Sequence, residues 1–243
     1  MKFLLDDGEI EVSVRELVIA GWTGRDREAQ QAHIRELAEL GVAPPLSTPM
    51  YYRASKELLT QNPIVDILGD RSSGEVEAFL LTWNGQILLG VGSDHTDRKL
   101  EAQDVTLSKQ QCPKPVSARL WRYQEVARHW DELILRSSIE SSSGIEEFQD
   151  LRIYQESNIS ALLPPESILA GLGRLFATDD TYTMDQLPDG LLIFLGTIPV
   201  KGGFVFTSDN FRVELHVPIK NRSIEHRYRA RNILVHNAEG QYA

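Results

Sequence analysis

The chain of 243 residues contains a single cysteine, Cys112, so no disulfide can form within it. One cysteine is typical of a reducing compartment. No apolar run approaches the roughly 20 residues needed to cross a bilayer, and residues 1–5 run directly into acidic residues, too early for a signal peptide. These absences predict a cytoplasmic protein with no membrane partner.

Positive charge is also scarce. The chain has 25 Lys and Arg against 35 Asp and Glu, a formal net charge of −10, without a basic cluster. This argues against nucleic acid as the main partner. The Walker and Rossmann glycine motifs are absent as well. What is present, 42% hydrophobic and 25% charged residues, is ordinary for a globular protein that buries a core.

Strand-like segments dominate the chain. Residues 1–20 predict two short strands, Asp26 is a candidate cap for a helix ending near Leu40, and 64–91 reads mostly as strand. Further helices are expected at 124–133 and from 164 to about 176. Further strands are expected at 135–139, 191–195, 204–206, 212–217 and 228–234. Many short strands with few helices predict an α+β, mainly β fold rather than repeated βαβ units.

Asn84-Gly85 separates two of these strands and is the strongest short hairpin signal, because both central residues of a type I′ turn need positive φ. A two-residue turn pairs Trp83 with Gln86 and places Glu75 opposite Asp94. Glu77 shares the face of Glu75, because side chains alternate along a strand. The register therefore predicts three carboxylates on one patch.

Like charges opposite one another destabilise a sheet, so a cation is expected among Glu75, Glu77 and Asp94. Three hard oxygen ligands suit Mg²⁺ first, with Mn²⁺ or Ca²⁺ as alternatives. The alternative interpretation is that Glu75 and Glu77 are the solvent-facing residues of an alternating strand. A bulge or a longer turn would shift the register and remove the convergence.

The ordered carboxylates resemble the fumarylacetoacetate hydrolase (FAH) superfamily, whose metal motif is Glu-x-Glu on one strand and Asp on the next. Glu75, Glu77 and Asp94 match that motif, and residues 94–98 (Asp-His-Thr-Asp-Arg) match the Asp-x-x-x-Arg run that the family's Asp opens. The resemblance implies that the three carboxylates hold a divalent ion. Arg98 is expected to orient one of these carboxylates by contacting it without binding the ion itself.

Further segments follow in the family's order. Lys109 precedes a Cys-Pro turn, and residues 196–199 match the family's Gly-Thr-x-Pro. Residues 155–160 (Gln-Glu-Ser-Asn-Ile-Ser) are similar to its Gln and Asn-Thr-Ser segment, with Ile where Thr is usual. The resemblance implies that Lys109 holds negative charge on the substrate and that Thr197 binds a substrate carboxylate. Three further residues are expected at the substrate pocket: Arg53, Tyr154 and Gln155.

A looser match concerns the lid that hydrolases of the family carry. His33 and Glu36 have the spacing of the family's His-x-x-Glu, and residues i and i+3 share a helix face. A His near its reference pKa of about 6.5 suits a general base that activates water. The alternative is a half-exposed His on an amphipathic helix. The family's Asn-Tyr before the lid is missing, and residues 21–24 (Gly-Trp-Thr-Gly) stand there.

The resemblance spans about residues 20–230 and implies an FAH-like mixed β-roll or β-sandwich with a few flanking helices. A single catalytic domain over 1–243 is expected, with N-terminal strands and a lid-like helix in 1–60 and the β-roll core in 61–243. The implied protein is a homodimer that acts on a small 2-oxo acid. The expected reaction is metal-dependent hydrolysis of a C–C bond in an acylpyruvate or related β-diketo acid. A lyase (decarboxylase or dehydratase) at the same metal is the alternative, and a non-catalytic metal-binding module is the second alternative.

Overall fold

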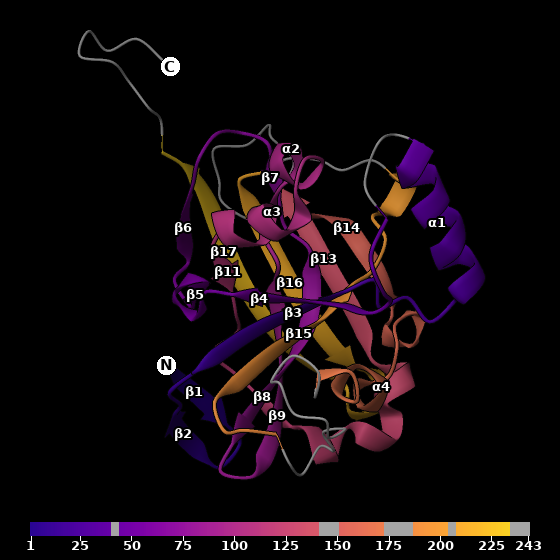
Figure 1. The fold of residues 1–243 in the computed structure, drawn as a ribbon. Helices are drawn as coiled ribbons and strands as arrows, with labels where there is room; N and C mark the ends of the chain where they lie inside the picture. Colours follow the sequence, from indigo (N-terminus) through magenta and orange to yellow (C-terminus); the bar gives the residue numbers. More distant parts are fainter. Residues whose placement is uncertain (40–43, 141–150, 173–186, 204–207, 234–243) are drawn as a thin grey trace, which may run out of the picture.

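Two large β-sheets form the centre of the computed structural model, which describes residues 1–39, 44–140, 151–172, 187–203 and 208–233 (Figure 1). In spatial order, the six-stranded sheet comprises β12 (Trp121–Arg122), β9 (Gln86–Ser93), β8 (Val76–Trp83), β15 (Leu191–Thr197), β3 (Glu16–Gly21) and β4 (Met50–Ala54). The five-stranded sheet comprises β14 (Leu151–Asn158), β13 (Ile134–Glu140), β16 (Asn210–Val217), β17 (Arg222–Asn232) and β6 (Ile64–Ile67).

Smaller elements surround these sheets. Three short strand pairs are β1 (Lys2–Leu5) with β2 (Gly8–Glu11), β7 (Ser72–Ser73) with β10 (Thr96–Asp97), and β5 (Leu59–Thr60) with β11 (Lys114–Pro115). The α-helices are α1 (Arg27–Glu39), α2 (Arg98–Glu101), α3 (Val105–Gln111) and α4 (Pro165–Leu169). Short 3₁₀ segments lie at Lys56–Leu58, Tyr123–Glu125, Ala127–Glu132, Ile159–Ala161, Lys201–Gly203 and Pro218–Lys220. This strand-rich arrangement confirms the predicted α+β, mainly β fold. Within the described ranges, no helix has the length and apolar character to span a membrane.

The β8–β9 hairpin has the predicted register. Asn84 (φ +49°) and Gly85 (φ +69°) both adopt the positive φ of a type I′ turn, and Trp83 pairs with Gln86. The pairing continues without a bulge to Val76 opposite Ser93. The short turn therefore fixes which residues stand opposite one another at the far end of the hairpin.

Successive side chains of β8 enter two apolar clusters. Val76 and Leu80 pack in the larger cluster, together with residues of the five-stranded sheet such as Leu135. Phe79 enters a second cluster on the opposite face, which includes Phe3 of β1. Because β8 is buried on both faces, a polar side chain on it is held in low-dielectric surroundings. Glu77 is two residues from Phe79, so its side chain lies on the same face of β8 as the second cluster.

Some predicted elements differ from the structure. Residues 124–133 form 3₁₀ turns instead of an α-helix, because Val126 (φ −123°, ψ −8°) and His129 (φ −116°, ψ 18°) leave helical geometry. The helix predicted from 164 ends at Leu169, while 173–176 and the strand predicted at 204–206 lie outside the described residues. The strands β3 and β14 and the helix α3 were not expected. In Figure 1, α2 and α3 lie together at the end of the sheets opposite α4.

Candidate metal centre

The three predicted carboxylates meet at the end of the hairpin away from its turn. Asp94 N donates a hydrogen bond to Glu75 O at 3.0 Å, so Glu75 stands opposite Asp94 as predicted. One oxygen of Glu75, one of Glu77 and one of Asp94 all lie within 4.8 Å of one another. Glu77 is 2% exposed and Asp94 is fully buried. The predicted convergence of the three carboxylates is therefore confirmed.

Glycine on the partner strand makes room for the neighbouring chain. Gly92 pairs with Glu77, and a Cβ at Gly92 would lie 2.6 Å from Pro115 O and 2.9 Å from the Phe194 ring. Only glycine allows the segment around Pro115 to cross β9 this closely. That segment brings Lys114 next to Asp94.

Glu77 is oriented by a bulge in β15. The register between β15 and β8 shifts between Phe194 and Thr197, and Gly196 lies within this irregularity with φ +99°. The Gly196 N–H donates to Glu77 Oε2 at 2.9 Å. A Cβ at Gly196 would lie 1.9 Å from Thr23 Oγ1, so glycine is required for both the conformation and the close approach.

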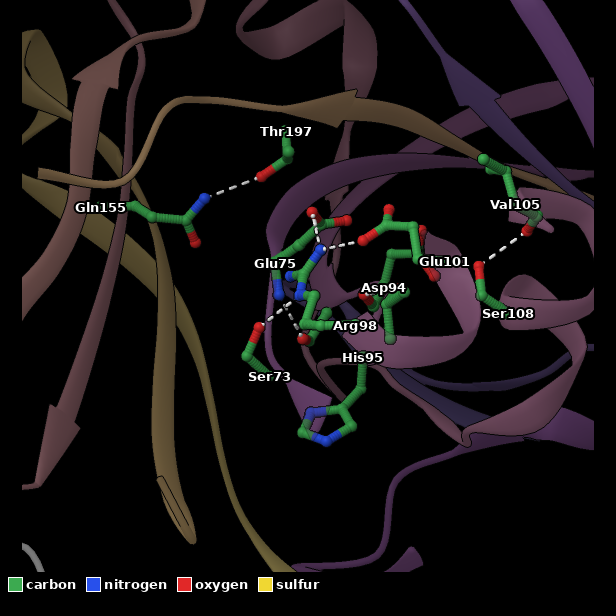
Figure 2. A network of polar contacts seen from close by, with 12 residues as sticks. Ser73, Glu75, Asp94, His95, Arg98, Glu101, Val105, Ser108, Gln155 and Thr197 are labelled. Carbon is green, nitrogen blue, oxygen red and sulfur yellow. Dashed lines mark hydrogen bonds and ion pairs between the residues drawn. The ribbon is translucent and has the colours of Figure 1, made fainter. Parts of the chain in front are cut away.

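Arg98 orients Glu75 from the start of α2, as the sequence predicted. Its Nη1 lies 2.8 Å from Glu75 Oε1 and 2.8 Å from Glu101 Oε2, and its Nε donates to Ser73 Oγ at 2.6 Å (Figure 2). The Asp97 side chain caps α2 by accepting a hydrogen bond from Leu100 N. A planar guanidinium with three fixed partners holds Glu75 in one orientation.

Two lysines contact Asp94, one at each oxygen. Lys109, on α3, contacts Oδ2 and lies 3.6 Å from Glu75 Oε2. Lys114 Nζ forms an ion pair with Oδ1 at 2.8 Å and donates to His95 O at 2.7 Å. Asp104 begins α3 by accepting a hydrogen bond from a backbone N–H within the first turn. Lys109 and Lys114 thus approach the same carboxylate from different segments of the chain.

The electrostatics of this cluster follow from burial and pairing. The pKa of Glu77 is raised well above its ordinary value, first by burial and then by repulsion from Asp94. Burial also raises the pKa of Asp94, but the charges of Lys109 and Lys114 outweigh it and lower that pKa overall. Burial lowers the pKa of Lys109, yet the surrounding carboxylates raise it on balance, so Lys109 stays charged.

Glu77 makes no ion pair with any described residue, although it is buried. Four carboxylates (Glu75, Glu77, Asp94 and Glu101) face three cations (Arg98, Lys109 and Lys114). An unmatched buried carboxylate is costly. A hard divalent cation among three carboxylate oxygens would supply the missing charge, so the residues present fit such an ion.

Thr197 and Gln155 lie next to this centre but use their polar atoms within the protein. Gln155 is 1% exposed; its Oε1 accepts from Val76 N and Ser137 Oγ, and its Nε2 donates to Thr197 Oγ1 at 2.9 Å and Ile198 O (Figure 2). Thr197 Oγ1 donates in turn to Val76 O at 2.9 Å. Gln155 therefore links the two large sheets, and the Thr197 hydroxyl has its hydrogen engaged.

The other predicted site residues lie further out. Tyr154 is buried in an apolar cluster around Tyr228. Arg53, on β4, is half-exposed and pairs with Glu16 at 2.8 Å. His33 and Glu36 both fall in α1, as predicted, but their side chains lie outside what the structure describes. The lid dyad therefore stays a prediction.

The sequence did not indicate three residues of the cluster. Lys114 stands between two prolines, and nothing in that pattern signals a buried cation. Glu101 joins through its ion pair with Arg98. The Tyr52 hydroxyl faces the charges of Lys109, Glu101 and Asp94, and burial raises its pKa. All three reach the centre by tertiary packing, for which local sequence carries little signal.

His95 follows Asp94 directly and points to the opposite face, as expected from alternation. Its Nδ1 lies 3.0 Å from the Tyr228 hydroxyl and its Nε2 lies 2.8 Å from Ser72 Oγ. Burial lowers the pKa of His95 to about 3. A neutral, fully bonded imidazole in the core supports the packing role that the sequence suggested for this residue.

Several solved structures share the fold of this chain. A putative fumarylacetoacetate isomerase/hydrolase from Oleispira antarctica covers 95% of this chain and 100% of its own, with TM-score 0.64 and 15% identity. A fumarylpyruvate hydrolase from Pseudomonas aeruginosa, in complex with Mn²⁺ and pyruvate, covers 95% and 96%, with TM-score 0.58 and 14% identity. A 2-keto-3-deoxyarabinonate dehydratase covers 90% of this chain and 74% of its own, with TM-score 0.59 and 16% identity.

The chain thus shares its fold with these FAH-type proteins, as the sequence resemblance predicted. No curated protein matches the chain. Residues 20–228 match the model of the family described as "Protein of unknown function (DUF2848)", and the chain belongs to this family.

Proposed function

We propose that this protein is a divalent-metal-dependent enzyme that hydrolyses a C–C bond in an acylpyruvate or related 2-oxo acid. The observation that carries the proposal is the set of three converging carboxylates, two of them buried, with one carboxylate unmatched by a cation and a charged lysine beside them. The fold supports it, because a hydrolase with this fold is described with Mn²⁺ and pyruvate. We further propose a cytoplasmic homodimer with its active site in one catalytic domain.

Glu75, Glu77 and Asp94 would hold the ion, with Mg²⁺ as the first choice and Mn²⁺ or Ca²⁺ as alternatives. When bound, the ion supplies Lewis-acid stabilisation of negative charge that develops on the 2-oxo acid. The protein's part is to hold the three carboxylates in place. Arg98, the Gly196 N–H and Lys114 do so through the contacts described above.

Lys109 is the group best placed to bind the substrate's own charge. Its ammonium stays protonated, because the carboxylates around it raise its pKa. An ammonium can hold a carboxylate or an enolate oxygen as a point charge. Thr197 would contribute at the rim of the same site, with the neighbouring backbone N–H groups, once its hydroxyl turns from Val76 O. Tyr154, Gln155 and Arg53 stay proposed pocket residues.

Hydrolysis also needs an activated water. We assign this step to His33, oriented by Glu36, because both lie on α1 at a spacing of three residues. His33 would take a proton from water so that hydroxide attacks the substrate carbonyl next to the C–C bond to be cleaved. That bond would then break, with the acyl group released as a carboxylic acid and the electron pair left on the 2-oxo acid fragment, which takes up a proton. This assignment separates the proposed hydrolase from a lyase, which needs the same metal without the activated water.

A lyase is the second candidate. The observation that favours it is the segment Gly21–Gly24 (Gly-Trp-Thr-Gly), which replaces the Asn-Tyr expected before a hydrolytic lid. A sugar-acid dehydratase shares the fold. A decarboxylase or dehydratase would use Glu75, Glu77, Asp94 and Lys109 as above and release its product without adding water across a C–C bond.

Calorimetry tests the metal site directly. Wild type and Glu75→Ala would be titrated with Mg²⁺ and with Mn²⁺, each with and without oxalate as a chelating mimic of the enolate. We expect wild type to bind either ion, oxalate to tighten binding, and Glu75→Ala to lose both effects. If wild type binds no divalent ion even with oxalate, the proposal is wrong.

Isotope labelling then separates the two reactions. Turnover of an acylpyruvate in ¹⁸O-labelled water places label in the released acid only if cleavage is hydrolytic. His33→Ala should abolish turnover while metal and oxalate binding persist. Unchanged turnover in this variant would rule out the His33 step. A protein that binds 2-oxo acids and turns none over would instead be a non-catalytic binding module.

A further inference from the structure

Asp94 is flanked in the chain by two polar residues whose side chains point away from the metal centre. Because side chains alternate along an extended segment, Ser93 and His95 share the face opposite to Asp94. Figure 2 shows the His95 ring turned away from the carboxylates. Ser93 and His95 are both fully buried. Buried polar groups need hydrogen-bond partners, so the contacts of these two side chains fix the main chain on both sides of Asp94.

The Tyr228 hydroxyl contacts both of these side chains. It lies 2.8 Å from Ser93 Oγ and 3.0 Å from His95 Nδ1. A phenol hydroxyl can donate one hydrogen bond and accept another, so it can bond both groups at once, whichever tautomer His95 adopts. Ser93 Oγ also accepts the Glu75 N–H at 3.1 Å. A single oxygen on β17 is therefore connected to the main chain around two proposed metal ligands, Asp94 and Glu75.

The position of the Tyr228 hydroxyl is itself fixed by packing. Tyr228 is 1% exposed, and its ring stacks on Phe211 with ring centroids 5.2 Å apart and an interplanar angle of 13°. A Cβ at Gly74 would lie 2.5 Å from the hydroxyl oxygen, so glycine is required for the chain next to Glu75 to approach it. Tyr228 belongs to the five-stranded sheet, whereas Ser93 ends β9 of the six-stranded sheet. The hydroxyl thus joins the two sheets next to the carboxylates.

We propose that Tyr228 is a positioning residue of the metal centre, whose hydroxyl keeps Asp94 and Glu75 in place for a divalent ion. This inference rests on the proposed metal site. The contacts described above hold the carboxylate side chains, whereas Tyr228 holds the main chain that carries them. Loss of the hydroxyl would leave Ser93 and His95 each one buried partner short, so the segment around Asp94 would move to satisfy them. Outer partners of metal ligands typically change metal affinity by about 10- to 100-fold.

The test is Mn²⁺ affinity, measured by calorimetry on wild type, Tyr228→Phe and Tyr123→Phe. Tyr228→Phe keeps the ring and removes only the hydroxyl, and we expect Mn²⁺ affinity to fall about tenfold. Tyr123→Phe is the matched control, because it removes a hydroxyl from a buried tyrosine whose partner, Glu166, lies outside the metal centre. Both variants should lower the midpoint of urea unfolding in EDTA, but Tyr123→Phe should leave Mn²⁺ affinity unchanged. The EPR spectrum of bound Mn²⁺ should broaden in Tyr228→Phe alone, because displaced ligands distort the surroundings of the ion.

Ser93→Ala is a second variant that decides the question if Tyr228→Phe does not fold. It breaks the link from the hydroxyl to the Glu75 N–H and should also lower Mn²⁺ affinity. Because the hydroxyl acts partly through Ser93, the double variant should lose less affinity than the product of the two single losses.

The inference is overturned if a folded Tyr228→Phe or Ser93→Ala binds Mn²⁺ as tightly as wild type, or if Tyr123→Phe loses as much affinity as Tyr228→Phe. Single losses that simply multiply in the double variant would also overturn it. Each of these results leaves the metal site intact. Absence of Mn²⁺ binding by wild type would instead refute the proposed function, so the two failures are distinguishable.

Discussion

Glu77→Gln should stabilise the metal-free protein while it destroys metal binding. Glu77 is buried, unpaired, and within 4.8 Å of the Asp94 and Glu75 oxygens. At an effective dielectric constant of 20, one such repulsive pair at 4.8 Å costs about 3.5 kcal/mol. Attraction to Lys109 offsets roughly one of the two pairs, which leaves on the order of 3 kcal/mol. Glutamine keeps an oxygen for the Gly196 N–H and removes the charge.

Whether Glu77→Gln is more or less stable than wild type depends on pH and on bound metal. The pKa of Glu77 is raised in the folded protein, so the folded state binds the extra proton and wild type loses stability as pH rises through that pKa. The advantage of Glu77→Gln should therefore be largest at pH 8 and shrink on acidification. Saturating Mn²⁺ should reverse the order, because an ion at 1,000 times its Kd adds about 4.1 kcal/mol to wild type alone, which exceeds the advantage of the variant.

The assay is thermal unfolding at pH 8 with EDTA and again with Mn²⁺. For a chain of this size, 3 kcal/mol corresponds to a rise in Tm of about 6–12 °C for the variant in EDTA. Glu57→Gln, at an exposed position on the Lys56–Leu58 turn, is the control and should change neither Tm. The reasoning fails if Glu77→Gln is no more stable than wild type in EDTA, or if Mn²⁺ still raises its Tm.

Three further predictions concern other parts of the structure. Burial lowers the pKa of His226 to about 4. Between pH 6.5 and 4 the unfolded chain therefore binds more protons than the folded protein, so acidification through this range should lower the stability by about 3 kcal/mol. His226→Phe, which keeps stacking on Tyr228, should remove this fall in a urea series across pH. Gly196→Ala should cost about 1–3 kcal/mol through backbone strain and its contact with Thr23, and should abolish Mn²⁺ binding in calorimetry. Gln155→Leu should cost about 2–4 kcal/mol in urea unfolding, because it leaves several buried partners unpaired.

Each of these has an outcome that contradicts it. If the stability of His226→Phe still falls between pH 6.5 and 4 as it does in wild type, groups other than His226 govern acid unfolding. Gly202→Ala is the control for Gly196→Ala, because it carries a similar φ of +78° but an added Cβ meets nothing within 4 Å. If Gly202→Ala loses Mn²⁺ binding as fully as Gly196→Ala does, the close approach at Gly196 is not what metal binding requires. A Gln155→Leu variant as stable as wild type would mean that water satisfies the freed groups.

Local signals were sufficient for the hairpin and for the convergence of the carboxylates. Asn84-Gly85 fixes the turn through its requirement for positive φ, and strand alternation carries that register to Glu75 and Asp94, each nine residues from the turn. The start of the helix at Arg27–Glu39 was also readable, because Asp26 caps it through the N–H groups of Glu28 and Ala29. The helix expected at 124–133 was wrong, because tertiary packing breaks that segment into 3₁₀ turns.

The sequence by itself therefore determined the strand-rich class, the hairpin register and the three carboxylates on one face, because each depends on turn chemistry and periodicity within a short stretch. Only the tertiary structure decided how these carboxylates are held. Lys114, Arg98 and the Gly196 N–H reach them from three separate segments, and their contacts depend on close packing at Gly92 and Gly196. Burial, which raises the pKa of Glu77, and the carboxylates gathered around Lys109, which keep it charged, are likewise properties of the assembled sheets and not of any local pattern.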